Sequence, residues 1–270
     1  MNAPGPDLPL AGGMLYPQAE TPAEVAANLA AIRERMARAC ARAGRDPAGV
    51  RLLPVSKTVD QARIRFAHAA GYRAFGENKV QEVQLKQPQM ADLGDVEWIV
   101  IGHLQTNKAK VVARLASEFQ ALDSLRLAEA LEQRLRHEQR QLDVLVQINT
   151  SDEPSKYGLH PDVAASFIQQ LQQFPSLRVK GLMTLAIQSA DPERVRACFV
   201  RLRQLRDRLL PDLPAGMRLD ELSMGMSGDF EIAIEEGATV VRVGQAVFGA
   251  RALPHHHYWP SQQLPEEQVL

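Results

Sequence analysis

Cysteine and long apolar runs are scarce in this sequence. Its 270 residues include only two cysteines, Cys40 and Cys198, which lie far apart in helix-like segments. They offer neither a disulfide framework nor a metal-ligand spacing, and they suit a reducing cytoplasm. No Lys or Arg precedes Arg33, so the basic region of a signal peptide is missing, and no apolar run approaches the ~20 residues of a membrane span. We therefore expect a cytoplasmic protein without a membrane partner.

The sequence also lacks an excess of positive or of negative side chains. The chain has 31 Lys and Arg residues against 32 Asp and Glu residues, which gives a formal net charge of −1 at pH 7. This balance creates no global basic field for nucleic acid or anionic lipid. Arginines do gather between Arg194 and Arg208, but they recur at helical spacing, as on a solvated helix face. We expect no nucleic-acid partner.

The first regular element follows a segment without periodicity. Residues 1–20 are rich in Pro, Gly and Ala, which predicts a mobile N-terminal tail. Thr21 is then placed to cap a helix that begins at Pro22, and Glu24 completes a capping box. Apolar residues follow at spacings of three and four, which predicts one buried helix face made of Val25, Leu29, Ile32 and Met36.

Beyond residue 50, strand-like and helix-like segments alternate. Short apolar runs such as Val144-Leu145-Val146 suit parallel strands that are buried on both faces. Helical stripes such as Leu127, Leu131 and Leu135 lie between them. Eight such units predict an α/β fold, a single (β/α)₈ barrel of the TIM type with an extra N-terminal helix. The strand candidates are residues 51–58, 74–78, 97–102, 118–123, 142–149, 177–186, 218–225 and 239–249.

An open, doubly wound sheet is the alternative fold. No Gly-x-Gly-x-x-Gly follows the first strand, which weakens a dinucleotide-binding interpretation. No linker interrupts residues 21–253, so we predict one domain there and a C-terminal tail over residues 254–270. That tail holds three adjacent histidines, 255–257. Adjacent residues do not share a helix face, and we therefore predict no metal site.

The side chains that follow the strands decide function in a barrel, because active sites gather at the carboxyl ends of the strands. The first strand candidate carries Lys57 near its end. A lysine there is often an ion-pair partner. The alternative is a desolvated amine with a lowered pKa, which attacks carbonyl groups. The residue by itself leaves both open.

The seventh and eighth strand ends indicate an anion site. Ser227 and Gly228 directly precede a predicted helix over residues 230–236, where backbone N–H groups and the helix dipole favour negative charge. Gly244, after the eighth strand, allows a ligand to approach the backbone. These glycines would also serve simple tight turns. We favour phosphate because barrels frequently bind it after strands seven and eight, and both ends agree here.

Seven short motifs stand in order along the chain. They are Val55-Ser56-Lys57-Thr58, Phe75-Gly76-Glu77-Asn78 with Val80-Gln81-Glu82, Ile101-Gly102-His103-Leu104-Gln105 with Asn107-Lys108, Ser155-Lys156-Tyr157-Gly158, Gly181-Leu182-Met183, Ser223-Met224-Gly225-Met226-Ser227 and Val241-Arg242-Val243-Gly244. Each motif is weak alone, but seven in register are specific. Together they resemble one family, the pyridoxal phosphate homeostasis proteins. The resemblance runs from about Thr21 to Arg251, and the two tails lie outside it.

The resemblance implies a barrel like the N-terminal domain of alanine racemase and pyridoxal 5′-phosphate (PLP), the vitamin B6 cofactor, as ligand. Lys57 would be the Schiff-base lysine, and Arg242 would face the pyridine nitrogen. The phosphate would be held by Ser227 and the backbone near Gly244 and Gln245. Two further residues would lie nearby, Ser223 and Asn78. Gly228 stands where many relatives carry an acidic residue, which puts only the detail of the phosphate loop in doubt.

The resemblance further implies a PLP carrier for cofactor homeostasis and delivery, with no catalytic residue and apo-enzymes as transient partners. An arginine at the ring nitrogen fits this role, because it keeps that nitrogen unprotonated and the ring a poorer electron sink. An amino-acid racemase is the first alternative, although no residues remain for the second domain that supplies its tyrosine. A Schiff-base aldolase is the second. We expect a monomer, with Lys156 as a candidate second PLP acceptor.

Overall fold

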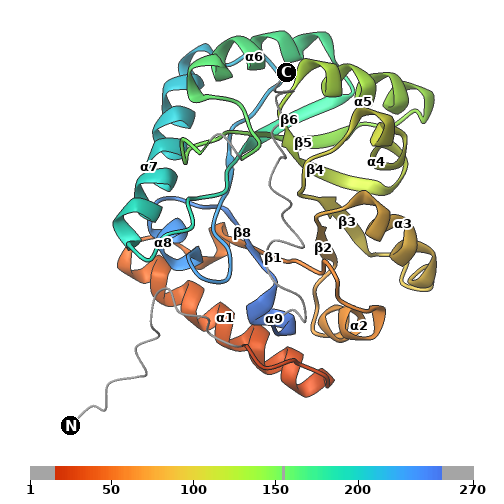
Figure 1. Cartoon of the computed structure of the whole chain (residues 1–270), viewed down its shortest axis with the longest axis vertical. Coiled ribbons are helices and arrows are strands. Elements are labelled where there is room, and N and C mark those ends of the chain that lie inside the picture. The colour runs from red at the N-terminus through yellow and green to blue at the C-terminus, as the bar shows by residue number, and fades with distance from the viewer. Residues whose placement is uncertain (1–15, 154–155, 251–270) are drawn as a thin grey trace, which may run out of the picture.

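The protein is a barrel of eight parallel strands (Figure 1). The computed structural model describes residues 16–153 and 156–250. The strands follow the order β1-β8-β7-β6-β5-β4-β3-β2. A bridge from Val55 to Gly76 joins β1 to β2, where Ser56 N donates to Gly76 O (2.9 Å). The predicted barrel is confirmed. The strands are β1 (Arg51–Pro54), β2 (Ala74–Glu77), β3 (Glu97–Val100), β4 (Ala116–Leu122), β5 (Leu142–Gln147), β6 (Leu177–Met183), β7 (Glu221–Ser223) and β8 (Val240–Val243).

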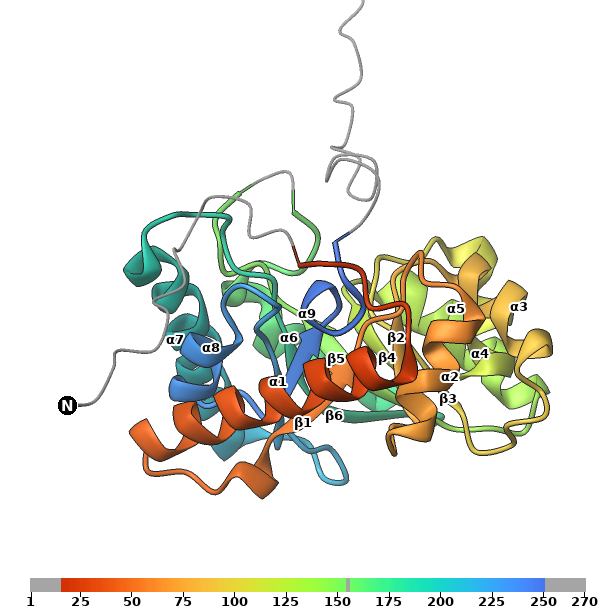
Figure 2. The same cartoon turned by 90° about the horizontal axis from the view of Figure 1, so that it is seen from below.

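Helices surround the strands on the outside of the barrel (Figures 1 and 2). Most follow a strand in the chain, as right-handed βαβ units require. Within the described residues, no helix combines the length and the apolar character needed to cross a bilayer. The helices are α1 (Pro22–Arg42), α2 (Gln61–Ala69), α3 (Val80–Gln89), α4 (Ala109–Leu115), α5 (Leu125–His137), α6 (Ala164–Gln170), α7 (Pro192–Leu209), α8 (Phe230–Glu235) and α9 (Gln245–Phe248).

The first helix begins as its sequence predicts. The Thr21 hydroxyl accepts from Glu24 N (3.3 Å), and Glu24 Oε2 accepts from Thr21 N (3.0 Å), so the capping box is formed. The apolar stripe of α1 is buried. Helix α1 lies beside α8 and α9, and Figure 2 shows it next to β1.

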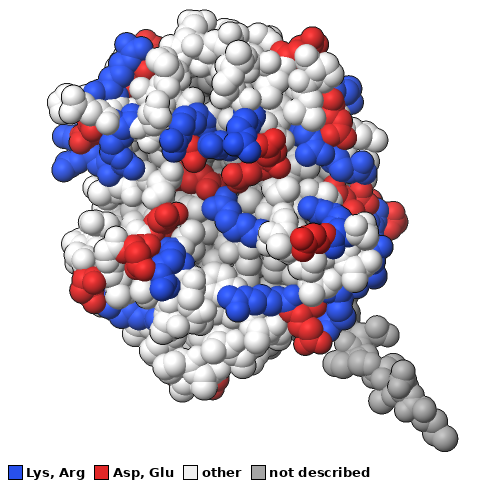
Figure 3. All heavy atoms as spheres, turned by 180° about the vertical axis from the view of Figure 1, so that it is seen from behind, with Lys and Arg blue, Asp and Glu red and all other residues white. Residues whose placement is uncertain are grey.

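The core has two layers because successive side chains of a strand point to opposite faces. Alternate residues Leu53, Val55 and Val240 point into the barrel, where they form a small apolar cluster with Ile99 and Ile101. The larger apolar cluster lies between the strands and the helices. On the face opposite to Figure 1, basic and acidic side chains are interspersed, as the near-zero net charge suggests (Figure 3).

Several strands are shorter than the sequence predicts, and three differences bear on the candidate site. Strand β1 ends at Pro54, so Lys57 lies in the following turn rather than inside the strand. The eighth strand ends at Val243, because residues 245–248 turn into α9 and bury Val247 and Phe248. Residues 16–20 belong to the predicted N-terminal tail, yet Ala19 is buried against the core. Residues 1–15 and the predicted C-terminal tail, including its three histidines, lie outside the described residues.

Candidate cofactor-binding site

Lys57 is a buried lysine at the carboxyl end of β1. It lies in a tight turn that Val59 N closes by donating to Ser56 O (2.9 Å), and only 6% of it is exposed. It follows the strand end at which Leu53 and Val55 belong to the apolar cluster inside the barrel. A lysine amine at such a strand end is a candidate nucleophile towards carbonyl groups.

The residue after Lys57 has a strained backbone. Thr58 has φ of 63°, in the left-handed region that β-branched residues rarely adopt. Its backbone N–H donates to Glu82 Oε2 of α3 (2.6 Å). Strain of this kind costs about 1–3 kcal/mol and persists only where neighbouring groups hold it. The conformation beside Lys57 is therefore imposed by α3.

A buried ionic cluster supports the same turn from outside the barrel. Lys86 Nζ, on α3, donates to Ser56 O (2.8 Å), Glu77 Oε1 (2.8 Å) and Glu82 Oε2 (3.0 Å). The Ser56 hydroxyl also donates to Glu77 Oε1 (2.6 Å). Burial raises the pKa of Glu77 to about 7, against the opposing effect of Lys86. Glu77 and Glu82 belong to the motifs of the sequence analysis, but their ion pairs with Lys86 were not predicted. The only sequence signal was the spacing of four residues between Glu82 and Lys86, which suits an ion pair on one helix face.

Asn78 follows β2 directly and so lies next to the end of β1. Its Oδ1 atom is buried and has no hydrogen-bond partner among the described residues. A buried acceptor left unpaired costs about 1–3 kcal/mol, and a bound ligand that donates a hydrogen bond would remove this cost. Asn78 therefore fits the expected place beside a ligand.

Arg242 is a buried cation inside the barrel. It is 3% exposed, and its Nη1 and Nη2 atoms donate to Ser223 Oγ (2.6 Å) and to Thr184 O (2.8 Å). Both acceptors are neutral. Burial lowers the pKa of Arg242 to about 10, although the charge of Asp229 opposes this. The side chain thus remains a cation at neutral pH and a donor for an acceptor atom inside the barrel.

A chain of hydrogen bonds runs onward from Arg242. The Ser223 hydroxyl donates to Gln120 Oε1 (2.6 Å), and Gln120 Nε2 donates to Glu118 Oε1 (2.5 Å). Glu118 in turn accepts from Arg51 (2.8 Å). The bonds from Arg242 to Glu118 all run in one direction, and Glu118 accepts from both Gln120 and Arg51. Such chains strengthen their members cooperatively. Gln120 and Glu118 were missed by the sequence analysis, because a strand candidate does not reveal which partners its inward side chains will meet.

The seventh and eighth strand ends meet where phosphate was expected. Ser227 Oγ accepts from Ala246 N (3.3 Å), which links the loop after β7 to α9. Gly244 precedes α9 and lies against β1, where a Cβ atom would come within 3.0 Å of Val55 O. Gln245 is the first residue of α9. Ser227, Gly244 and Gln245 are therefore close to the end of β1 and to the turn that holds Lys57.

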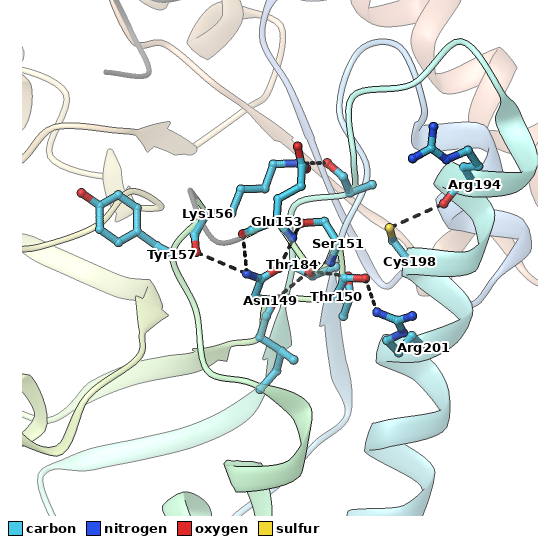
Figure 4. A network of polar contacts seen from close by, with 12 residues as sticks. Asn149, Thr150, Ser151, Glu153, Lys156, Tyr157, Thr184, Arg194, Cys198 and Arg201 are labelled. Atoms are coloured by element: carbon cyan, nitrogen blue, oxygen red, sulfur yellow. Dashed lines mark hydrogen bonds and ion pairs between the residues drawn. The ribbon is translucent and has the colours of Figure 1, made fainter. Parts of the chain in front are cut away.

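Lys156 belongs to a separate polar network in the loop after β5 (Figure 4). Its Nζ donates to Ala186 O (2.8 Å) and pairs with Glu153. Tyr157 points away from this network, and its ring stacks on His103 with centroids 3.9 Å apart and an interplanar angle of 8°. No group of three or more His, Cys, Asp or Glu is arranged for a metal ion in the part of the chain that the structure describes.

Comparison with known proteins identifies the family. A model of the alanine racemase N-terminal domain matches residues 27–252. The pyridoxal phosphate homeostasis protein of Pseudomonas aeruginosa is 44% identical over 227 residues, which are 84% of this chain and 96% of the relative. The chain belongs to the pyridoxal phosphate homeostasis protein family. The pyridoxal phosphate homeostasis protein of Aquifex aeolicus is 41% identical and covers 83% of this chain and 97% of its own length.

Solved structures agree with this family and with the fold. PipY of Synechococcus elongatus, a structure with PLP bound, has 36% identity and a TM-score of 0.74, covering 83% of this chain and 100% of that one. An alanine racemase of Clostridium difficile has a TM-score of 0.66 at 12% identity, which shows a common fold. The match takes in 57% of that racemase chain. The family relatives are thus matched over 96% or more of their length, and the racemase over little more than half of its chain.

Proposed function

We propose that this member of the pyridoxal phosphate homeostasis protein family binds PLP covalently through Lys57 and carries it for delivery to apo-enzymes. The observation that supports this most is the placing of three expected contacts on adjacent strands. Buried Lys57 follows β1, buried Arg242 lies on the neighbouring β8, and Ser227 bonds to Ala246 beyond β8. They would serve as the amine for the aldehyde, the donor to the ring nitrogen and a donor to the phosphate.

The residues present fit the cofactor. The Lys57 amine would bond to the aldehyde that PLP supplies when bound. Ser227, Gly244 and Gln245 would donate to the phosphate, since a doubly charged anion needs several donors. Arg242 would donate to the ring nitrogen and keep it unprotonated, because a guanidinium has no proton acceptor. Asn78 and Ser223 would border the ring, where the unpaired Asn78 Oδ1 offers an acceptor.

A carrier role is favoured over turnover for two reasons. The curated relatives are named homeostasis proteins rather than enzymes. The second reason is the residue expected at the ring nitrogen. It is Arg242, which donates to the neutral Ser223 hydroxyl, and not a carboxylate that would accept a hydrogen bond from a protonated ring nitrogen. A ring held unprotonated stabilises negative charge poorly. Alanine racemase resembles this arrangement and is an enzyme, so the names of the relatives carry most of the distinction.

The test is a covalent label on freshly purified protein incubated with PLP. Borohydride reduction should fix the cofactor on one peptide, and mass spectrometry should identify Lys57. In Lys57→Ala the visible absorbance band and the label should both disappear. Lys156→Ala is the matched control and should keep them, since Lys156 Nζ is bonded to Ala186 O in another loop. Labelling of Lys156 with Lys57 unmodified would overturn the assignment.

A further inference from the structure

A short segment in front of α1 lies across the phosphate side of the barrel. We call residues 16–20 the N-terminal strap. Ala250 N donates to Tyr16 O (2.8 Å), and Ala19 N donates to Phe248 O (3.4 Å). The strap therefore runs along the end of α9 and the residues that follow it.

The contact between the strap and α9 is close. Gly249 has φ of 98°, and a Cβ atom on it would lie 2.5 Å from Gln18 Cα. Only glycine adopts this conformation without strain and leaves room for the strap. Asn28, on α1, adds a bond to Val247 O (3.0 Å). The strap and the start of α1 thus hold α9 from one side.

The strap also reaches the loop after β7 through one side chain. The Tyr16 hydroxyl donates to Ser227 O (3.1 Å). Arg35 binds the same region, because it makes two 2.8 Å bonds to Glu231 and lies 4.5 Å from the Phe230 ring centre. Hydrogen bonding to Glu231 raises the pKa of Arg35, with a smaller contribution from the Tyr16 hydroxyl. Tyr16 and Arg35 therefore bind neighbouring parts of the segment after β7, at Ser227 and at Glu231.

We infer that the strap positions the phosphate site and that Tyr16 is its positioning residue. The strap bonds to both loops that would donate to phosphate, at Ser227 and at the end of α9, while it contributes none of the donors assigned above. It precedes residue 27, where the match to the family model begins. The match to the alanine racemase N-terminal domain therefore does not include the strap. This inference rests on the proposed binding of PLP.

The physical effect is preorganisation. Donors that are already held in place lose less conformational entropy on binding, which raises affinity without a new contact. Tyr16 acts on the Ser227 backbone and not on the ring or on Lys57. Its removal should therefore weaken ligands with a phosphate and spare those without one. Thermodynamic linkage makes this coupling reciprocal. If the strap strengthens phosphate binding, a bound phosphate should stabilise the strap.

The first test compares PLP with pyridoxal, its phosphate-free form, on the full chain. Tyr16→Phe removes one hydrogen bond of about 0.5–1.5 kcal/mol, so PLP affinity should fall about 2- to 12-fold while pyridoxal affinity stays constant. Tyr72→Phe is the control, because the Tyr72 hydroxyl bonds to Arg33 Nε (2.8 Å), away from the strap. Equal loss of both ligands, or no loss of PLP, would overturn the inference.

The second test follows hydrogen exchange of the Ala19 and Ala250 amides, which bond to α9 and to the strap. In the parent protein, PLP should slow the exchange of these amides more than pyridoxal does. The slowing by PLP should be smaller in Tyr16→Phe than in the parent. If the parent binds PLP at Lys57 but these amides do not respond, the strap has no such role and the proposed function still stands. If the parent binds neither ligand, the proposed function fails and the inference fails with it.

Discussion

Single side chains at this site depend on neighbours that do not react. Lys57 sits in a turn whose peptide groups are bonded by Lys86 and Glu82. Arg242 is oriented by Ser223, which Gln120 orients in turn. A charged group in a low-dielectric interior is strongly affected by such partners. Substitution of a supporting residue should therefore change binding even though it touches no ligand atom.

At the residue scale, the phosphate assignment makes a direct prediction for Ser227→Ala. The variant loses one donor to a charged group, worth roughly 1.5–3 kcal/mol, so PLP affinity should fall tenfold or more by that estimate. Fluorescence or absorbance titration measures it. Ser166→Ala is the matched control, since that exposed hydroxyl bonds only locally to Val163 O (3.0 Å). If the parent binds PLP and pyridoxal equally tightly, no phosphate site exists at these strand ends.

At the scale of elements, β1, β2 and α3 meet around one buried carboxylate. Glu77 ends β2 and is fully buried, while Lys86 and Glu82 come from α3. Burial raises the pKa of Glu77 from 4.5 to about 7. The folded state therefore binds this proton more tightly than the unfolded state. The associated stability is complete below pH ~4.5 and is lost as pH rises through about 7.

This cluster predicts a pH-dependent effect of Glu77→Gln. Glutamine does not titrate, so the variant avoids the cost of ionising residue 77. Relative to the parent, its free energy of unfolding should rise between pH 5 and pH 8, by up to about 3 kcal/mol. Urea unfolding at both pH values measures this. Glu34→Gln, at an exposed pair with Arg38 on α1, should show no such change. An equal difference at both pH values would mean that Glu77 does not titrate in this window.

At the scale of the whole molecule, the barrel gathers the candidate site from every part of the chain. Lys57 comes from the first strand end and Arg242 from the last strand, and the two strands are paired. The strap adds residues that precede the first helix. The loop that holds Lys156 lies after β5, and its Tyr157 ring is stacked on His103.

This arrangement predicts that the PLP-bound protein does not turn over amino acids at an enzyme-like rate. Racemisation needs a base on each face of the substrate, and Lys57 can serve only one. Tyr16 is bonded to Ser227, and Tyr157 is stacked on His103. Incubation with L- and D-alanine or serine, followed by chiral analysis, should show no conversion at the ~1 s⁻¹ or faster that enzymes typically reach.

Lys57→Ala provides the blank for that assay. Conversion at several turnovers per second in the parent, absent from Lys57→Ala, would show that the protein is an enzyme and not a carrier. Loss of such activity in Tyr157→Phe would further identify the second base.

The sequence by itself determined the barrel, its first helix and the order of the strand-end motifs. These depend on local periodicity, on caps and on runs of apolar residues, all of which lie within a few positions of one another. The ends of elements were less certain. The strained turn at Thr58 and the helix α9 were both assigned to strands, because their conformations are imposed by α3 and by the start of α1.

Only the tertiary structure decided which groups support the site. Ser223 and its partner Gln120 are 103 positions apart, and Tyr16 and Ser227 are 211 apart. No periodicity links residues at such separations, since their contact exists only once the barrel has closed. The bond from Lys86 to the Ser56 carbonyl and the bonds of the buried Arg242 likewise form only in the closed barrel. The sequence shows which residues have suitable chemistry. The closed barrel determines their partners and their burial, and these in turn determine their charge.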